Sequence, residues 1–415
     1  MTNLVTSAES SVSAFLGARE SEVLDFAREL IATPSPNPPG DERAVADLVT
    51  ARLTDLGVTA VERVGTSEER PNLIIRVPGA SPGRVLMLSG HLDTKPAGDM
   101  EAWNTDPWDP LLRDGDLVGL GSGDMKAAVA AMTYVAAALA SVDRFPGELV
   151  VVFTADEEAG SLVGSKWLAE EGKIDADVAV IGEPSGITAE WEAIHLISRG
   201  AALFKVKVTG TQMHSSISDR VKGVNATVQM ARLIDRMDRE LKGYLTFEPH
   251  PLCPTGPTVN VGVMATAGVY YGVYPGNAEF ACDLRTIPGM SEDQLISDIE
   301  RFLDDAMADE PDLKAELVWD LMVPATEISA DEPIVAELQR AAKDVLGVAP
   351  RLDAFPGATD APHFQLTAGV PCVAAFGPGM LPRAHSPNES MTAAGVAQAA
   401  MIYGLAAIRY LEGVE

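Results

Sequence analysis

Residues 85–94 read VLMLSGHLDT, an apolar run followed closely by a histidine and an aspartate two positions apart. Such a run is typical of a buried strand, so His91 and Asp93 are predicted to lie where that strand ends. Open α/β sheets carry their functional groups at this end of the strands. His91 can bind a metal ion while Asp93 orients its imidazole, although a turn or a hydrogen-bonded core histidine explains the same two residues.

The composition limits the classes of function. A chain of 415 residues exceeds the usual size of one hydrophobic core, so two domains are expected, and 47% hydrophobic residues suffice to fill them. The net charge of -29, from 60 acidic and 31 basic residues, argues against nucleic acid or an anionic membrane as a partner, because both bind basic surfaces.

The cysteines and the N-terminal residues indicate the compartment. Cys253, Cys282 and Cys372 lack metal-ligand spacing, fit a reducing environment and are interpreted as buried small hydrophobic residues. Residues 1–10 contain no basic segment and no long apolar core, so they do not form a secretory signal. No apolar run reaches the roughly 18 residues that cross a bilayer, and even residues 127–139 are too short. A soluble, cytoplasmic protein is therefore expected.

The first half of the chain alternates strands and helices. Prolines interrupt a helical pattern at residues 33–40, so two helices are expected to flank a stiff surface loop. The strands are predicted at residues 72–77, 85–88, 148–153 and 178–181, and further helices at residues 125–139 and 162–171. This alternation predicts an α/β domain whose central sheet is covered on both faces.

The pattern changes near residue 198. Strands are predicted at residues 203–208, 258–263, 278–284 and 313–319, and helices at residues 224–237 and 291–307. Their order, β-α-β-β-α-β, is that of a small ferredoxin-like layer. The first pattern returns at residues 332–346, 372–376 and 392–411. The prediction is a discontinuous domain of residues 1–197 and 323–415, interrupted by an inserted domain of residues 198–322.

Further polar side chains follow predicted strands or open a predicted helix. Asp124 follows a glycine-rich segment at the start of a helix, and Glu157 and Glu158 end a strand. Glu183 ends the next strand, and His385 follows the late one. Each alone can be a helix cap, a solvated acidic loop or a surface residue. Because loops after strands converge on one crevice, together they predict a ligand set for two divalent metal ions bridged by a carboxylate.

In order and spacing, these motifs resemble those of the M20 metallopeptidase family, which includes acetylornithine deacetylase, succinyl-diaminopimelate desuccinylase, aminoacylase-1 and glutamate carboxypeptidase. The matching segments are residues 35–40, 89–94, 119–126, 154–158, 182–185, 210–215, 357–361 and 385–389, which cover nearly the whole chain. The resemblance implies a discontinuous catalytic domain with a central mixed sheet and a dinuclear metal centre. It also implies that the inserted domain is a lid and dimerisation domain.

The resemblance assigns a role to each residue of the centre. It implies metal ligands at His91, Asp124, Glu158, Glu183 and His385, with His91 and Glu183 on one ion, Glu158 and His385 on the other, and Asp124 bridging both. Asp93 would orient His91, and Glu157 would be the general base. Zinc is the expected metal, with cobalt or manganese as alternatives. Because the family has a cis peptide after its bridging aspartate, the bond between Asp124 and Met125 is expected to be cis.

The resemblance also names residues around the substrate. His214 would reach the active site of the partner subunit in a homodimer and stabilise the oxyanion, whereas an exposed loop histidine is the simpler explanation. Arg285 matches the position that grips a substrate carboxylate, with a structural salt bridge as the alternative. Gly357 belongs to a loop that faces substrate in the family, and nearby His363 is a weaker candidate for a pocket contact. His195 is assigned no role.

The departures from the family pattern lie mostly around substrate recognition. Gly272 stands where the lid segment of the family has an asparagine, so the substrate-binding amide is missing there. The same segment instead contains Tyr270, Tyr271 and Tyr274. We therefore expect an acyl or leaving group that is more apolar or aromatic than those of the biosynthetic members, held partly by stacking on Tyr271.

The combined motifs predict a two-metal amidohydrolase that cleaves a small-molecule amide next to a carboxylate, such as an N-acyl amino acid. A carboxypeptidase or dipeptidase uses the same machinery and stays open as an alternative. A non-catalytic relative that binds a metabolite is disfavoured because Glu157 and all five ligand positions are present. An aminopeptidase is disfavoured because Arg285 indicates recognition of a carboxylate.

Overall fold

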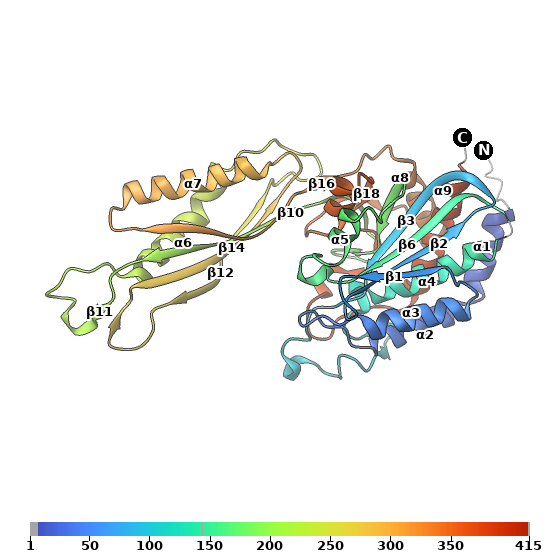
Figure 1. Cartoon of the computed structure of the whole chain (residues 1–415), viewed down its shortest axis with the longest axis horizontal. Helices are drawn as coiled ribbons and strands as arrows, with labels where there is room; N and C mark the ends of the chain where they lie inside the picture. The colour runs from blue at the N-terminus through green and yellow to red at the C-terminus, as the bar shows by residue number, and fades with distance from the viewer. Residues whose placement is uncertain (1–6, 143, 414–415) are drawn as a thin grey trace. The chain divides into compact units, whose positions relative to one another are not determined.

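The computed structural model describes residues 7–142 and 144–413. The chain divides into two compact units. The first unit contains Met1–Ile197, Glu327–Phe355 and Thr359–Glu415, and the second contains Ser198–Thr326 and Pro356–Ala358. The chain thus leaves the first unit, builds most of the second and returns (Figure 1).

A six-stranded mixed sheet lies at the centre of the first unit, as predicted. Its order is β1-β2-β6-β3-β7-β18, with antiparallel pairs from β1 to β6 and parallel pairs from β6 to β18. The strands are β1 (Val61–Gly65), β2 (Pro71–Pro78), β3 (Ser81–His91), β6 (Pro146–Thr154), β7 (Val178–Ile181) and β18 (Cys372–Val373). Only β1 was not predicted, because this short edge strand is mostly exposed and lacks an apolar run.

Helices cover both faces of this sheet, which confirms the predicted doubly covered arrangement (Figure 1). One layer contains α1 (Ser7–Gly17), α2 (Glu20–Ile31), α3 (Arg43–Asp55), α4 (Ala127–Ala140), α8 (Pro333–Leu346) and α9 (Ala393–Glu412). On the other face, a core cluster joins strand residues such as Met87 and Val152 to Leu168 of α5 (Ser165–Glu170) and to Phe364. Side chains alternate along the strands, so one strand serves both layers.

The α9 helix belongs to the core of the first unit. Within the described part of the chain it is the one helix that could cross a membrane by length and composition, but 72% of its most apolar window is buried inside the protein. It contacts α1, α4 and α8. A Cβ atom at Gly404 would lie 2.5 Å from Cδ1 of Leu16, so this glycine permits α1 and α9 to approach closely. The apolar character of α9 is therefore explained by helix packing.

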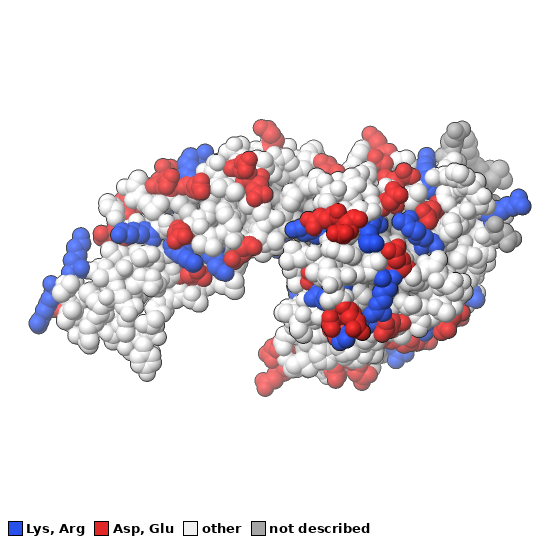
Figure 2. Space-filling model, viewed as in Figure 1, with Lys and Arg blue, Asp and Glu red and all other residues white. Residues whose placement is uncertain are grey.

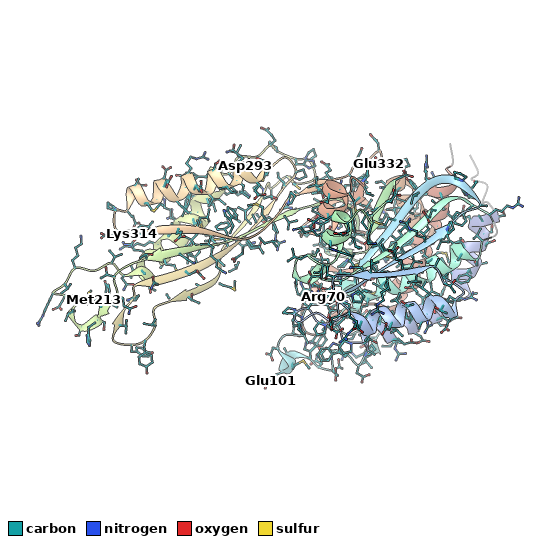
Figure 3. The ribbon with its side chains drawn as sticks, in the orientation of Figure 1. Arg70, Glu101, Met213, Asp293, Lys314 and Glu332 are labelled. Carbon is teal, nitrogen blue, oxygen red and sulfur yellow. The ribbon has the colours of Figure 1, made fainter. Side chains whose placement is uncertain are left out.

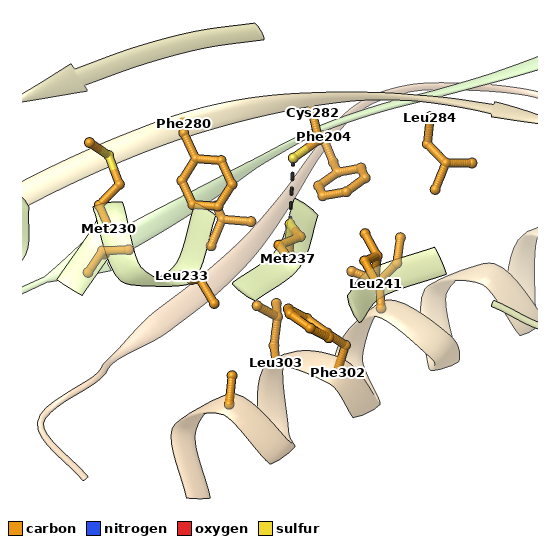
Figure 4. Close-up of a cluster of buried hydrophobic side chains, with 14 of the residues drawn as sticks. Phe204, Met230, Leu233, Met237, Leu241, Phe280, Cys282, Leu284, Phe302 and Leu303 are labelled. Carbon is orange, nitrogen blue, oxygen red and sulfur yellow. Dashed lines mark hydrogen bonds between the residues drawn. The ribbon is translucent and has the colours of Figure 1, made fainter. Parts of the chain in front are cut away.

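The second unit is a four-stranded antiparallel sheet that carries two helices on one face. The sheet order β12-β14-β10-β15 and the chain order strand, helix, strand, strand, helix, strand confirm the ferredoxin-like prediction. Its elements are β10 (Gly200–Thr209), α6 (Ala226–Tyr244), β12 (Thr258–Ala267), β14 (Asn277–Thr286), α7 (Glu292–Asp309) and β15 (Ala315–Val323). Strand side chains such as Phe280 and Cys282 meet Met237 of α6 and Phe302 of α7 in the core (Figure 4).

All three cysteines are free and buried, as predicted. The sulfur of Cys282, for example, lies 3.7 Å from that of Met237. The strand β9 (Ala193–Ser198) was not predicted, and it pairs with β17 (Arg351–Phe355) in a small sheet of three strands. Its two polar residues, His195 and Ser198, are both fully buried.

Candidate metal centre

The register of the parallel strands brings the predicted loops together. His91 of β3 lies opposite Thr154 of β6, and Ser89 lies opposite Ile181 of β7. The loops that follow β3, β6 and β7 therefore leave the sheet at the same edge. This edge is where an open α/β sheet places its ligands.

Two groups of three potential metal ligands meet at this edge. The first triad is His91, Asp124 and Glu183, and the second is Asp124, Glu158 and His385; the ligand atoms of each lie within 4.8 Å of one another. Asp124 belongs to both triads. Its Oδ1 lies 3.0 Å from Nε2 of His91, and its Oδ2 lies 3.1 Å from Nε2 of His385. The two oxygens of one carboxylate thus face two different imidazoles.

The donor atoms fit divalent cations. Imidazole nitrogen and carboxylate oxygen bind zinc at about 2.0–2.2 Å, so neighbouring ligand atoms around a tetrahedral ion lie about 3.3 Å apart. In the first triad, Nε2 of His91 lies 3.0 Å from Asp124 and 3.5 Å from Glu183. In the second triad, Nε2 of His385 lies 3.1 Å from both Asp124 and Glu158. Both triads therefore have the spacing and the chemistry of cation sites.

The pKa shifts show that the centre favours positive charge. Burial, followed by the charge of Asp124, raises the pKa of Glu183 well above its usual range. Burial acts to lower the pKa of His385, but hydrogen bonds to Asp124 and Glu158 outweigh it and raise the pKa to about 11. Burial also acts to lower the pKa of His91. Its hydrogen bonds to Asp124 and Asp93 outweigh this effect, so the pKa of His91 is raised. A buried carboxylate cluster of this kind is stabilised when a cation joins it.

Asp93 supports the centre with both its backbone and its side chain. Nδ1 of His91 lies 2.9 Å from the backbone carbonyl oxygen of Asp93 and 3.6 Å from its carboxylate. Because a carbonyl oxygen can only accept, Nδ1 is the donor, and Nε2 faces the triads. The Asp93 carboxylate accepts hydrogen bonds from the backbone N–H groups of Glu157 at 3.2 Å and Glu158 at 3.1 Å. One residue thus orients His91 and also holds the acidic turn.

A chain of polar residues, all buried except the half-buried Arg70, extends from Asp93, and we call it the Asn37 network. Nδ2 of Asn37 donates to Asp93 at 2.9 Å and to Asp156 at 3.0 Å. Arg70, which directly precedes β2 (Figure 3), contacts Asp156 at 2.6 Å and Glu42 at 3.0 Å. Burial and the charge of Asp93 raise the pKa of Glu42 to about 7. The sequence reasoning assigned no role to these four residues; the available signals were the positions of Asn37 in the proline-rich loop and of Asp156 in the motif of residues 154–158.

The segment that carries Asp124 is fixed from the C-terminal part of the chain. The peptide bond between Asp124 and Met125 is cis, as expected. Glu389 is buried, and its Oε1 accepts hydrogen bonds from the backbone N–H groups of Gly123 at 2.9 Å and Asp124 at 3.1 Å. Glu389 stood within a recognised motif but was given no role in the sequence reasoning. It thereby fixes the backbone of Asp124, the residue that the two triads share.

Glu157 stands beside the triads on the turn that follows β6. Burial raises its pKa well above the usual range; the charge of His91 opposes this, and the charge of Asp360 adds to it. Asp360 is itself buried and accepts hydrogen bonds from the hydroxyl groups of Ser161 at 2.6 Å and Ser165 at 2.5 Å. The loop of residues 357–361 is thereby attached to the segment after Glu157.

The remaining predicted residues are counted with the second unit and lie on separate elements. His214 is exposed on β11 (Met213–His214), and its Nδ1 accepts a hydrogen bond from the backbone of Ser216 at 3.2 Å. Nε of Arg285 on β14 pairs with Asp283 of the same strand at 2.8 Å. Tyr271 follows β12 and is 93% exposed, and Gly357 belongs to the short segment Pro356–Ala358. Within the first unit, the structure thus gathers the five predicted ligands, Asp93 and Glu157.

Comparisons with known proteins agree with this site. Residues 87–409 match the model of peptidase family M20/M25/M40. A succinyl-diaminopimelate desuccinylase of Parvibaculum lavamentivorans is 29% identical over 94% of this chain and 96% of its own length. The enzyme of the same name from Xanthomonas oryzae pv. oryzae is 30% identical over 85% of this chain and 89% of its own length.

Among solved structures, the dipeptidase Dug1p from Saccharomyces cerevisiae superposes with a TM-score of 0.78, covering 99% of this chain and all of that one, at 17% sequence identity. At this identity the likeness concerns the fold alone. The family model, in contrast, spans most of the chain and includes the end of β3, which carries His91. The chain therefore belongs to the M20 family of metallopeptidases and is a metal-dependent hydrolase.

Proposed function

We propose that this hydrolase cleaves the amide bond of an N-acyl amino acid or a similar amide that bears a carboxylate. The observation that carries this proposal is the position of Asp124, whose two oxygens face His91 and His385 in two adjoining triads. Relatives that are named succinyl-diaminopimelate desuccinylase and reach 30% identity support a deacylase. A dipeptidase or carboxypeptidase of the same family is the alternative.

The two triads would hold one divalent ion each and share Asp124. Zinc fits the set of imidazole and carboxylate donors best, and cobalt or manganese can replace it. Bound ions of this kind lower the pKa of a shared water and polarise the carbonyl group of an amide. The burial of His91 and Glu183 keeps the first triad away from bulk solvent.

Glu157 is the proposed general base. Its backbone N–H donates to Asp93, and burial raises the pKa of its carboxyl group, which makes the carboxylate a better proton acceptor. In the reaction, the oxygen of water bonds to the carbonyl carbon and its proton passes to Glu157. The C–N bond then breaks, and Glu157 delivers the proton to the leaving nitrogen.

Residues of the second unit are proposed to recognise the substrate. Arg285 would bind the substrate carboxylate, and its pair with Asp283 would hold the guanidinium ready in one orientation. The ring of Tyr271 is 93% exposed and meets the ring of Tyr270 edge to face at a centroid distance of 5.8 Å, and its exposed face would stack on an apolar or aromatic group. Gly357 would face the substrate from its loop. His214, exposed on β11, would stabilise the oxyanion in the site of the partner subunit.

The proposed homodimer forms through the second unit. β12 is an edge strand of its sheet and exposes Val263 and Met264, and the loop that follows exposes Val269 and Tyr270. Figure 2 shows few charged side chains where β12 and this loop lie. An apolar edge strand of this kind favours pairing with a second copy. Sedimentation at micromolar concentration should give the mass of a dimer, and Met264→Glu should give the monomer.

A cytoplasmic location is the accompanying proposal, supported by three free cysteines. Fractionation of cells would test it: accumulation outside the cytoplasm would contradict it.

Amine release from a panel of amides tests the activity. The panel contains N-succinyl-diaminopimelate, N-acyl amino acids with aliphatic and aromatic acyl groups, and dipeptides, each beside its carboxamide counterpart, with zinc or cobalt added. We expect hydrolysis of N-acyl amino acids that carry a free carboxylate. Hydrolysis of dipeptides alone would favour the alternative, and equal hydrolysis of the carboxamides would exclude the carboxylate clamp. Binding of metal without hydrolysis of any amide would indicate a non-catalytic relative.

A further inference from the structure

The two triads differ in the ion pairs that their carboxylates form with basic side chains. The buried Lys126, two positions after Asp124, donates to the carbonyl oxygen of Thr33 at 2.7 Å and, in the described part of the chain, pairs with neither triad. Within the described residues, neither Asp124 nor Glu183 of the first triad forms an ion pair with a lysine or arginine. The second triad has Lys95 beside it. Nζ of Lys95 lies 3.3 Å from Oε2 of Glu158, and the backbone N–H of Lys95 donates to Oε1 of Glu158 at 3.0 Å.

The position of Lys95 does not depend on the carboxylate alone. Its Nζ also donates to the backbone carbonyl oxygen of Glu158. The backbone before Lys95 is fixed because the N–H of Thr94 donates to Ser35 at 3.0 Å and its carbonyl accepts from Asn37 at 2.8 Å. The ammonium group is therefore held beside Glu158 through the backbone as well as through the carboxylate.

Lys95 lies at the rim of the centre. Its side chain is 37% exposed, whereas that of Glu158 is 3% exposed. The exposed end of the second triad is also marked by His385, whose side chain is 45% exposed. In the first triad, by contrast, His91, Asp124 and Glu183 are all buried.

We propose that Lys95 is a fixed positive charge that weakens cation binding at the second triad, so that the two triads bind the same metal ion with unequal affinity. This inference rests on the proposed two-metal centre. Lys95 acts in two ways: its N–H groups compete for the oxygens of Glu158, and its charge repels a divalent cation a few ångströms away. A unit charge at this distance weakens cation binding on the order of ten- to a hundredfold, even in well-solvated surroundings.

The consequence is a centre with one firmly held ion and one exchangeable ion. The buried first triad would fill at low concentrations of metal. The second triad would fill only when the free metal concentration is higher, so the metal supply would set the fraction of fully loaded protein.

Titration of the metal-free protein with Co²⁺ tests the proposal, because the visible absorption of cobalt reports binding without any assay of activity. The wild-type protein should bind two equivalents in separate steps. Lys95→Met, which keeps the length of the side chain and removes its charge, should bind the second equivalent at least about tenfold more tightly and the first within about threefold of wild type. Lys95→Arg, which keeps the charge, should resemble the wild type.

A gain of affinity cannot result from misfolding, so the test does not depend on comparing damaged proteins. Glu158→Gln assigns the steps, because it should remove the weaker event alone. The proposal is overturned if Lys95→Met leaves the second affinity unchanged or lowers it, or if it strengthens both steps equally. If the wild type binds no cobalt, the two-metal centre itself is wrong, and that failure is distinct.

Discussion

The metal centre of the first unit and the recognition residues of the second unit are built under different constraints. In the first unit, His91, Asp124 and Glu183 are buried and lie within hydrogen-bonding distance of further polar groups of the same chain. In the second unit, Tyr271 is 93% exposed. The other residues proposed for recognition there, such as His214 on β11 and Arg285 on β14, lie on different elements. Burying a charge without a partner costs several kcal/mol, so a buried centre must contain its own partners. The exposed residues proposed for recognition have no such need, because water solvates them.

The largest effect that separates the two regions is expected from Asp124→Asn. Because this carboxylate faces both histidines, its loss should remove both cobalt-binding steps and lower kcat about 10³-fold or more. Metal content and amine release measure the two effects. Glu183→Gln is the matched control and should weaken only the tighter step. Retention of both ions by Asp124→Asn would show that the two triads do not share a ligand.

Glu157→Gln separates chemistry from metal binding within the same centre. The amide cannot accept a proton, so kcat should fall about 10²- to 10⁴-fold while both equivalents of cobalt still bind. Glu101→Gln, at an exposed glutamate of the first unit, serves as the control and should change neither. A Glu157→Gln protein with wild-type kcat would assign the base elsewhere.

Asn37→Ala tests whether the Asn37 network contributes to metal binding. Without the amide, the carboxylates of Asp93 and Asp156 lose a shared donor, so the affinity for the first cobalt equivalent should fall about 10- to 100-fold. Asn72→Ala is a matched control, because buried Asn72 bonds only the backbone of Ala155 and Val163. Equal losses of metal affinity in the two variants would show that the Asn37 network only stabilises the fold.

Arg285→Met tests whether the second unit takes part in substrate binding. If Arg285 binds the substrate carboxylate, KM for free acids should rise about tenfold or more, and cobalt binding and the hydrolysis of carboxamides should stay unchanged. Asp283→Asn removes the partner of Arg285 and should change KM much less. If both variants lower thermal stability equally without a change in KM, the pair is a structural salt bridge.

The smallest effect concerns His195, which is buried in the first unit but lies outside the centre. Burial lowers the pKa of His195, and its Nε2 donates to the carbonyl of Ser185 at 2.9 Å. The folded protein therefore keeps His195 neutral while the unfolded chain binds a proton near pH 6.5. The resulting stability is present above that pH and is lost as the pH falls towards the folded pKa. His195→Gln, unfolded by urea with chelator present, should show a smaller loss of unfolding free energy between pH 7 and pH 5 than wild type.

The ligands could be predicted because each one follows a strand or opens a helix, and the ends of parallel strands meet. The pairing of the strands that end at His91 and Thr154 follows from their buried apolar runs, which are visible in the sequence. The Asn37 network and Glu389 could not be predicted in the same way. Asn37 and Asp156 are 119 positions apart, and Glu389 reaches the backbone of Asp124 from 265 positions away. Contacts between residues that lie far apart in the sequence leave no periodic pattern.

The order in which the pieces of the first unit occur along the chain has a consequence for synthesis. His385, Glu389 and α9 belong to the last segment, Thr359–Glu415, whereas Ser198–Thr326 is continuous. On the ribosome, the second unit can fold as soon as it emerges, but the first unit has to wait for its final helix. A nascent chain that stops before His385 lacks a ligand of the second triad and the residue that holds Asp124. The centre can therefore assemble only after the segment that carries His385 and Glu389 has been synthesised.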